Sequence, residues 1–553
     1  MRRLAACVGL IILVLPLLQG PVAQASDPPP SVLRIALSSL PKSLFPIGPR
    51  TREMSYLRGF TGRSLTIYDK SWAVACALCT ELPSLQNGRV RIVQRADGRK
   101  GIDVTFDLLP DLAWDDGAPV TTEDVRLGVD VAHALGSGAA ALPNVLDVVV
   151  EGDRRFTLRT AEMRFDYNRM EELLLLPAHR ERAAFDAAAT PAEYRARSLY
   201  TTDPTAPGLS YGPYRLVRTA PDELALARNP HWHGKQPSFE RIELHEVADP
   251  AVLEADLRAH RIDMVAGETA LDLDDIYRLE AADRNSAYEF IYKPQLEYAH
   301  IDVNLSNELL RDKRIRRALL LSLDRPIQIS GRDRQTRGEA PPSFLPPASP
   351  NFDPTLKPAP YDPAQAAAVL DAAGFAMGPD GIRADGQGRR LAFGLAAELD
   401  FPFSRRLAET VREQWRRSGI EITLEDRRMA EILPKRQFDL AYYAWVNAPE
   451  FLLAPVYGAT GIPSAENNFR GLNFPGLDNA EMNQVTRALT TEMDPGKRLL
   501  LWRRAQQIYA EELPALPLAF VPQKFILPTG MTGVEPTGHL IPTSYWVEDW
   551  KIE

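Results

Sequence analysis

A strand–helix–strand pattern in the C-terminal half limits this chain to folds in which helices cover a β-sheet. Large apolar side chains at every second position mark two strands: Leu391, Phe393 and Leu395 in the first, and Ile420, Ile422 and Leu424 in the next. The helix between them carries apolar residues four apart: Leu407, Val411 and Trp415. Gly419 is placed to end that helix. Helix and strand joined this closely predict an α/β fold.

The N-terminal segment predicts export from the cytoplasm. Arg2 and Arg3 precede an apolar run over residues 4–18, which is short of a membrane span. Ala23-Gln24-Ala25 then offers small residues at the two positions that a signal peptidase reads. We expect cleavage after Ala25 and a periplasmic protein. The alternative is an uncleaved membrane anchor.

Size and charge narrow the choice of partner. Removal of residues 1–25 leaves 528 residues, which is enough for two or three domains. The net charge of −9 for the whole chain becomes −11 when the segment with Arg2 and Arg3 is lost. An acidic protein gains nothing from counterion release on a polyphosphate, so we expect no nucleic-acid partner.

Only two cysteines remain after the predicted cleavage, Cys76 and Cys79. In an oxidising compartment this pair predicts a local disulfide. The alternatives are a thioredoxin-like redox pair, which needs a helix directly after the first cysteine, and a zinc site, which needs two more ligands at suitable spacing. Neither requirement is visible in the sequence, so we expect no metal and no cofactor.

A strand over residues 102–108 is followed by a tight turn and a helix start. Gly117 can take the positive φ that the turn needs, and Thr121 with Asp124 is typical of a capping box. The adjacent pair Asp115-Asp116 lies in this turn, where a structural role is expected instead of acid–base catalysis.

Several segments together resemble the family 5 extracellular solute-binding proteins, the dipeptide- and oligopeptide-binding class served by ATP-driven importers. The matching stretches run in order from about residue 32 to residue 520. They are 106–125 with the run Leu-Ala-Trp-Asp-Asp-Gly-Ala-Pro-Val-Thr-Thr-Glu-Asp-Val, then 212–216, 228–237, 241–244, 312–318 with 324–325, and 361–363 with 372–375.

The resemblance implies a fold of two lobes joined by hinge strands, with an extra subdomain in the first lobe. The expected division is 26–68, 208–295 and 521–553 for lobe one, 69–207 for the extra subdomain with both cysteines, and 296–520 for lobe two. Two chain crossings between lobes can act as hinges for closure on a ligand.

Residues 440–452 carry the clearest information about the ligand. The segment aligns with a stretch around an Asp-Pro, which in peptide-binding members also has a carboxylate four residues before the proline to hold the ammonium group. Here that position is Trp445, and Ala448 replaces the aspartate. Glu450 is a substitute carboxylate. We expect Tyr443, Trp445 and Asn447 to line the cleft; the alternative places these aromatic residues in a buried core.

Three arginines in glycine-containing segments, Arg58, Arg63 and Arg470, are candidates for a bidentate clamp on a ligand carboxylate. The alternative for each is an ordinary solvated arginine. The pair His231 and His233 suggests a metal site, but the resemblance places it on a surface turn.

The sequence therefore predicts a monomeric substrate-binding component of an ABC transporter. It would bind a peptide or peptide-like small molecule between its lobes and deliver it to the permease subunits. Within this class the alternative ligand is a non-peptide solute, such as an opine-like amine, a glycoside or a chelated metal. An exported hydrolase would need a nucleophile with a nearby base, and no such catalytic pair is visible. An exported chaperone would bind unfolded chains weakly and broadly.

Overall fold

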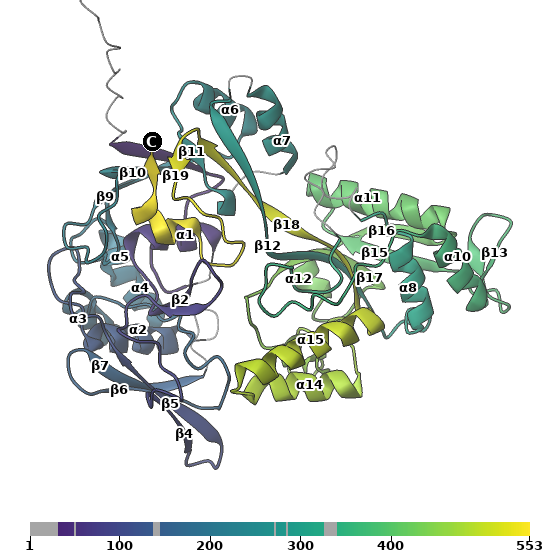
Figure 1. Ribbon diagram of the computed structural model, residues 1–553, viewed down its shortest axis with the longest axis horizontal. Coiled ribbons are helices and arrows are strands. Elements are labelled where there is room, and N and C mark those ends of the chain that lie inside the picture. Colours follow the sequence, from purple (N-terminus) through teal and green to yellow (C-terminus); the bar gives the residue numbers. More distant parts are fainter. Residues whose placement is uncertain (1–30, 49–50, 137–143, 270–272, 284–285, 326–339) are drawn as a thin grey trace, which may run out of the picture.

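The computed structural model describes residues 31–48, 51–136, 144–269, 273–283, 286–325 and 340–553, so the predicted signal peptide lies outside the described residues. One ten-stranded mixed sheet runs through the molecule (Figure 1). Its strands, in spatial order, are β16 (Glu421–Asp426), β15 (Ala392–Ala397), β17 (Leu440–Val446), β12 (Tyr288–Val303), β18 (Ala515–Pro528), β11 (Met264–Val265), β1 (Val32–Leu37), β10 (Arg241–Glu246), β9 (Glu223–Arg228) and β8 (Tyr214–Ala220).

The two long strands β12 and β18 join the two halves of this sheet (Figure 1). We call the half built on β1 and β8–β11 lobe one, and the half built on β15–β17 lobe two. β12 and β18 pair antiparallel on both sides of the crossing, but their register shifts between Pro294 and Tyr298. β18 continues into lobe one by pairing with β11, whereas β12 continues into lobe two by pairing with β17.

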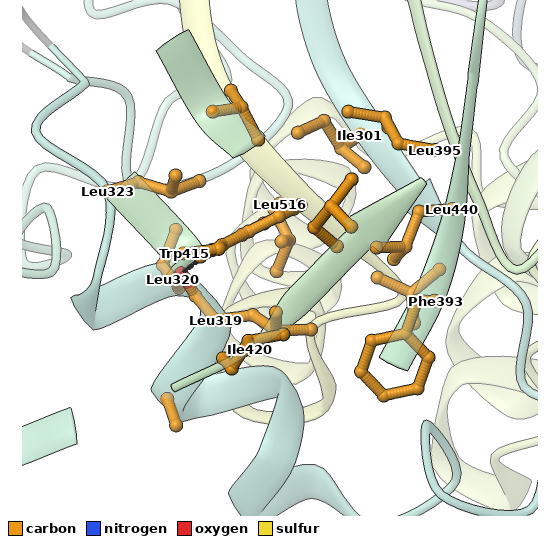
Figure 2. Packing of buried hydrophobic residues seen from close by; sticks show 14 of the residues in the cluster. Ile301, Leu319, Leu320, Leu323, Phe393, Leu395, Trp415, Ile420, Leu440 and Leu516 are labelled. Atoms are coloured by element: carbon orange, nitrogen blue, oxygen red, sulfur yellow. Dashed lines mark hydrogen bonds between the residues drawn. The ribbon is translucent and has the colours of Figure 1, made fainter. Parts of the chain in front are cut away.

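Lobe two contains the predicted strand–helix–strand unit. β15 and β16 pair in parallel, as expected, and α11 (Pro402–Arg417) connects them. The helix buries Leu407, Val411 and Trp415, and Gly419 follows it with a φ of +82°. Trp415 packs in the centre of the core of lobe two and donates its indole N–H to the Leu319 carbonyl at 2.9 Å (Figure 2).

The other elements of lobe two cover both faces of its sheet. α8 and α10 pack together on the Trp415 side, and α14 and α15 pack together around a second core on the opposite face. The elements are α8 (Lys313–Leu321), α10 (Pro363–Ala372), β13 (Ala376–Met377), β14 (Arg383–Ala384), α12 (Met429–Ile432), α13 (Ala454–Tyr457), η2 (Ala459–Gly461), α14 (Ala480–Thr491) and α15 (Pro495–Glu512).

A separate four-stranded sheet lies beside lobe one, with strand order β4 (Val90–Gln94), β5 (Lys100–Asp107), β7 (Arg155–Thr160) and β6 (Val145–Val150). α2 (Thr122–Leu135) begins as predicted: Asp124 accepts the Thr121 backbone N–H at 2.7 Å. Gly117 has a φ of +87° in the predicted turn. The buried Asp115 carboxylate accepts the N–H groups of Gly208 and Ser210, which is a structural task. The boundaries 69–207 stay a prediction.

The remaining elements complete lobe one and its neighbouring sheet. They are α1 (Arg52–Thr61), β2 (Thr66–Tyr68), β3 (Val74–Cys76), α3 (Ala178–Asp186), α4 (Pro191–Arg197), α5 (Leu199–Thr202), α6 (Pro250–Arg258), η1 (Gly267–Thr269), α7 (Leu273–Ala282), β19 (Met531–Thr532), η3 (Thr543–Asp549) and β20 (Lys551–Ile552). Within the part of the chain that the structure covers, none of the helices combines the length and apolar character needed to span a bilayer.

The structure joins Cys76 and Cys79 by a disulfide that lies against the core of the four-stranded sheet. Closing so short a loop restricts the unfolded chain modestly, so we expect the double variant C76A/C79A to lose about 2 kcal/mol of unfolding free energy. Urea titration measures this loss. Dithiothreitol should lower the stability of the wild type to that of the variant, and a wild type that is insensitive to dithiothreitol would contradict the prediction.

Candidate functional site

A cavity of about 660 Å³ lies between the lobes, beside the crossing of β12 and β18. Arg52 on α1 and Gly267 line it from lobe one, and Gln295 and Glu297 line it from β12. Lobe two contributes the residues that follow β15 together with the end of β17. These neighbouring strands are parallel, so their carboxyl ends meet at one edge, which is where open α/β sheets bind ligands. The volume is that of a typical small-molecule site.

Aromatic side chains dominate the wall from lobe two: Phe401, Phe403, Tyr442, Tyr443, Trp445 and Phe474. The sequence predicted two of them, Tyr443 and Trp445, for the cleft. Both are half-buried, because they line the cavity and also pack against the apolar cluster under α12. The ring of Trp445 meets those of Tyr443 and Phe474 edge-on, with centroids 6.4 and 6.3 Å apart. A role in ligand contact stays a prediction.

The hydroxyl of Tyr443 belongs to a buried polar network with residues of β12. Its hydroxyl donates to an oxygen of Asp302 at 2.6 Å, and Nε2 of His300 lies 3.3 Å from the other oxygen. Both Asp302 and His300 are buried on β12, and the imidazole stacks on Tyr298. Burial, and secondarily the charge of Asp302, raise the pKa of Tyr443 well above its usual value of 10. The hydroxyl therefore stays protonated and fixes the ring in the cavity wall.

The cavity also contains charged groups that the sequence reasoning missed. Arg52 reaches across from α1 to Glu297 on β12, with nitrogen and oxygen 2.6 Å apart, and Gln295 donates to the same carboxylate at 3.1 Å. Glu398 enters from lobe two, directly after β15. A signal for Glu398 was present, since a carboxylate at the carboxyl end of a predicted parallel strand points to a binding edge.

Asn447 and Glu450 were predicted for the cleft, but neither is among the described residues that line the cavity. Asn447 is buried and donates its amide to the Phe344 carbonyl at 3.3 Å. The carboxylate of Glu450 accepts the Asn351 amide at 3.2 Å and lies 3.8 Å from Nε of Arg498. Both side chains are occupied by structural partners within lobe two.

The three predicted clamp arginines do not meet in one place. Arg63 is buried, pairs with Glu548 at 3.0 Å and lies over the ring of Trp232. Arg58 lines a different, small cavity and donates to the Pro46 carbonyl at 3.0 Å. Arg470 is exposed in the loop between η2 and α14. A joint carboxylate clamp therefore has no geometric support.

Lobe two makes a second contact, away from the crossing strands, with the segment that follows β7 of the four-stranded sheet. We call this contact the clasp and define it by Phe165, Asp166 and Arg169 on one side, and Glu450, Thr490 and Arg498 on the lobe-two side. The Phe165 N–H donates to the Thr490 carbonyl at 3.1 Å, and Arg169 donates to the Glu450 carbonyl at 2.5 Å. The Arg498 guanidinium lies over the Phe165 ring, 5.4 Å from its centroid. Figure 1 shows α14 and α15 reaching toward the four-stranded sheet here.

His539 lines a neighbouring cavity of about 350 Å³ and is buried as a neutral ring. Its Nε2 lies 2.8 Å from the Asp69 carbonyl, and Nδ1 accepts the Ile541 N–H at 3.2 Å, so a second proton would displace a donor. Burial lowers its pKa from 6.5 to about 4.

Because the unfolded chain binds this proton first, stability falls as the pH drops from about 6.5 to 4. We expect a loss of about 2 kcal/mol between pH 7 and pH 5. Urea titrations at both pH values measure it. The variant H539Q should lose that part of the pH dependence, whereas the exposed-site control H231Q should keep it; equal pH dependence in all three proteins would refute the assignment.

Residues 97–463 match the family described as bacterial extracellular solute-binding proteins, family 5. The chain is 27% identical over 442 residues to the oligopeptide-binding protein OppA of Mycobacterium tuberculosis, covering 76% of this chain and 69% of that one.

Two solved structures share the fold. The oligopeptide-binding protein of Thermus thermophilus, complexed with a pentapeptide, has a TM-score of 0.68 at 22% identity and covers 94% of this chain and 96% of its own. NikA of Brucella suis, in complex with Fe(III)-EDTA, has a TM-score of 0.74 at 18% identity and covers 94% and 100%. Both are two-lobed binding proteins. With the matched residues covering well over half of its length, this chain belongs to the family 5 bacterial extracellular solute-binding proteins.

Proposed function

We propose that the protein captures a peptide or peptide-like solute in the cavity between its lobes and delivers it to the permease of an ATP-driven importer. The main support for this proposal is the cavity itself, which lies beside the two crossing strands and is lined by residues from both lobes. A ligand that contacts both lobes favours the closed arrangement over the open one, and no covalent step is needed. The relative from Mycobacterium tuberculosis is named for oligopeptide binding, which agrees with this ligand class.

The chemistry of the wall supports an amphipathic ligand. Its aromatic faces offer apolar contact, and its charged groups carry both signs: Arg52, Lys524, Glu297 and Glu398. A peptide has this combination of apolar side chains, an ammonium group and a carboxylate. We further propose that the mature protein starts after Ala25, works as a monomer in the periplasm and is divided into the lobes expected from the sequence.

A second candidate ligand is a chelated metal, because NikA of Brucella suis, which has a similar fold, was solved with Fe(III)-EDTA. The Arg52 side chain in the cavity would face the carboxylates of such a chelate. A hydrolase is disfavoured, since the described lining of the cavity contains no histidine or cysteine, and no hydrogen bond joins its one serine, Ser404, to a base among the described residues.

Purification of residues 26–553 without denaturation, followed by mass spectrometry of any co-purified small molecule, tests the proposal. Thermal-shift measurements with di- to pentapeptides and with Fe(III)-EDTA run alongside, because a ligand that binds only the folded state raises the melting temperature. Stabilisation by peptides supports peptide capture. Stabilisation by the chelate alone would mean that the ligand is a chelated metal and would leave the transport role in place. Turnover of the peptides would instead show that the protein is a hydrolase.

A further inference from the structure

Hydrogen bonds hold Glu398 in place at the surface where lobe two faces the cavity. It directly follows β15, and its backbone carbonyl accepts the Phe401 N–H at 3.3 Å. One oxygen of its carboxylate accepts the backbone N–H of Met429, the first residue of α12, at 3.2 Å. The side chain is half-buried and lines the cavity. Two elements of lobe two therefore hold this carboxylate in place before any ligand arrives.

The described lining contains two carboxylates, Glu297 and Glu398, and two cations, Arg52 and Lys524. Of the two carboxylates in the lining, Glu297 already has the Arg52 guanidinium at 2.6 Å and the Gln295 amide at 3.1 Å. For Glu398, by contrast, no lysine, arginine or histidine among the described residues comes within the 4.0 Å of an ion pair. A half-buried carboxylate with one backbone donor still lacks a counter-charge, and a cation placed beside it gains a charge-assisted hydrogen bond.

The neighbouring walls favour the same kind of partner. Trp445 and Phe474 present aromatic rings to the cavity, and Met429 and Leu433 add apolar surface. Aromatic faces attract cations, and apolar walls exclude the water that would weaken the ion pair. An anionic group would meet repulsion from Glu398 in the same place. The immediate surroundings of Glu398 therefore favour a positively charged nitrogen of the ligand.

We propose that Glu398 is the subsite for a primary ammonium group of the ligand. This inference rests on the proposed function and deepens it, because it defines the bound solute as cationic at one end. It also assigns the role that the sequence suggested for Glu450, whose carboxylate faces Asn351 and Arg498. The ammonium comes either from a peptide N-terminus or from a lysine side chain, and the two sources are separable by acetylation.

Three tetrapeptides provide the test, with dissociation constants measured by calorimetry: Ala-Phe-Ala-Ala, its N-acetylated form, and N-acetylated Ala-Lys-Ala-Ala. The isosteric variant E398Q keeps the acceptor for Met429, and E413Q on the exposed face of α11 is the matched control. We expect N-acetylation to weaken wild-type binding by about 10- to 100-fold and to cost E398Q almost nothing, since the two changes remove the same interaction. Recovery by the lysine peptide would identify the side chain as the ammonium source.

Equal binding of acetylated and free peptides by the wild type would overturn the proposal, as would an E398Q variant that loses affinity for both forms equally. Unchanged melting temperatures of the unliganded variants verify that they fold. Should none of the peptides bind the wild type, peptide capture fails as a function. The co-purified solute then replaces the peptides, and the ammonium subsite stands only if acetylating its amine abolishes binding to the wild type and not to E398Q.

Discussion

Asp302→Ala is expected to lower the unfolding free energy by about 3 kcal/mol and to weaken ligand binding by at least about tenfold. The buried carboxylate accepts the Tyr443 hydroxyl at 2.6 Å and lies 3.3 Å from Nε2 of His300. Its removal leaves the Tyr443 hydroxyl buried without an acceptor, which costs about 1–3 kcal/mol, and it opens a cavity beside His300. Binding suffers because Tyr443 forms part of the cavity wall. Urea titration and calorimetry measure the two effects.

Two conservative variants distinguish the contribution of the buried network to stability from the contribution of the cavity wall to ligand binding. Y443F removes one hydroxyl and leaves the ring, so it should cost about 1 kcal/mol of stability and little affinity. D302N keeps the shape of the side chain, so its loss of stability should lie between those of Y443F and D302A. If D302A and Y443F have the same ligand affinity, the network does not position the cavity wall, whatever it contributes to stability.

Arg169→Ala is expected to shift the protein toward an open arrangement. The Arg169 side chain is 9% exposed, lies 3.2 Å from Asp166 and donates to the Glu450 carbonyl across the clasp. Hydrogen bonds to charged groups contribute about 1.5–3 kcal/mol, and this contact exists only when the lobes are together. The loss therefore falls on the closed form, and apparent affinity drops by about 10- to 100-fold.

Small-angle scattering and calorimetry test the clasp together. The R169A variant should show a larger radius of gyration without ligand, and saturating ligand should restore most of the compact form. R169K keeps the charge but reaches fewer acceptors, so an intermediate effect is expected. The exposed arginine in R91A is the control and should match the wild type. An R169A protein with wild-type scattering and affinity would show that the clasp does not influence closure.

The parts of the fold that depend on neighbours in sequence could be predicted. The four-residue spacing that ends at Trp415, the glycine at 419 and the cap at Thr121 all report local conformation, and the structure confirms each. The order of the ten strands could not be derived this way. The hydroxyls of Tyr298 and Tyr509, which bond at 2.6 Å between β12 and α15, lie 211 residues apart along the chain. Only the family resemblance anticipated the two crossings.

The site was partly predictable for the same reason. Tyr443 and Trp445 lie on a strand whose end reaches the cavity, so two side chains with the chemistry expected of a ligand site also line the cavity. Arg63 has the chemistry of a ligand clamp, but Glu548, 485 residues later, neutralises it in the core. Distant partners of this kind decide whether a charged side chain is free for a ligand, and a single sequence does not reveal them.

The register shift at the lobe crossing has a consequence for how this protein can diverge. Gln295 and Glu297 lie in the stretch of β12 between Pro294 and Tyr298, where pairing with β18 is interrupted, and both also line the cavity. Under the proposed function, a substitution there would change both the ligand contacts and the ease with which the lobes separate. Selection for a new solute at these positions would then also alter capture and release. Substitutions in the lobe-two wall around Phe401 would change the cavity alone, because this residue lines the cavity and lies outside the two crossing strands.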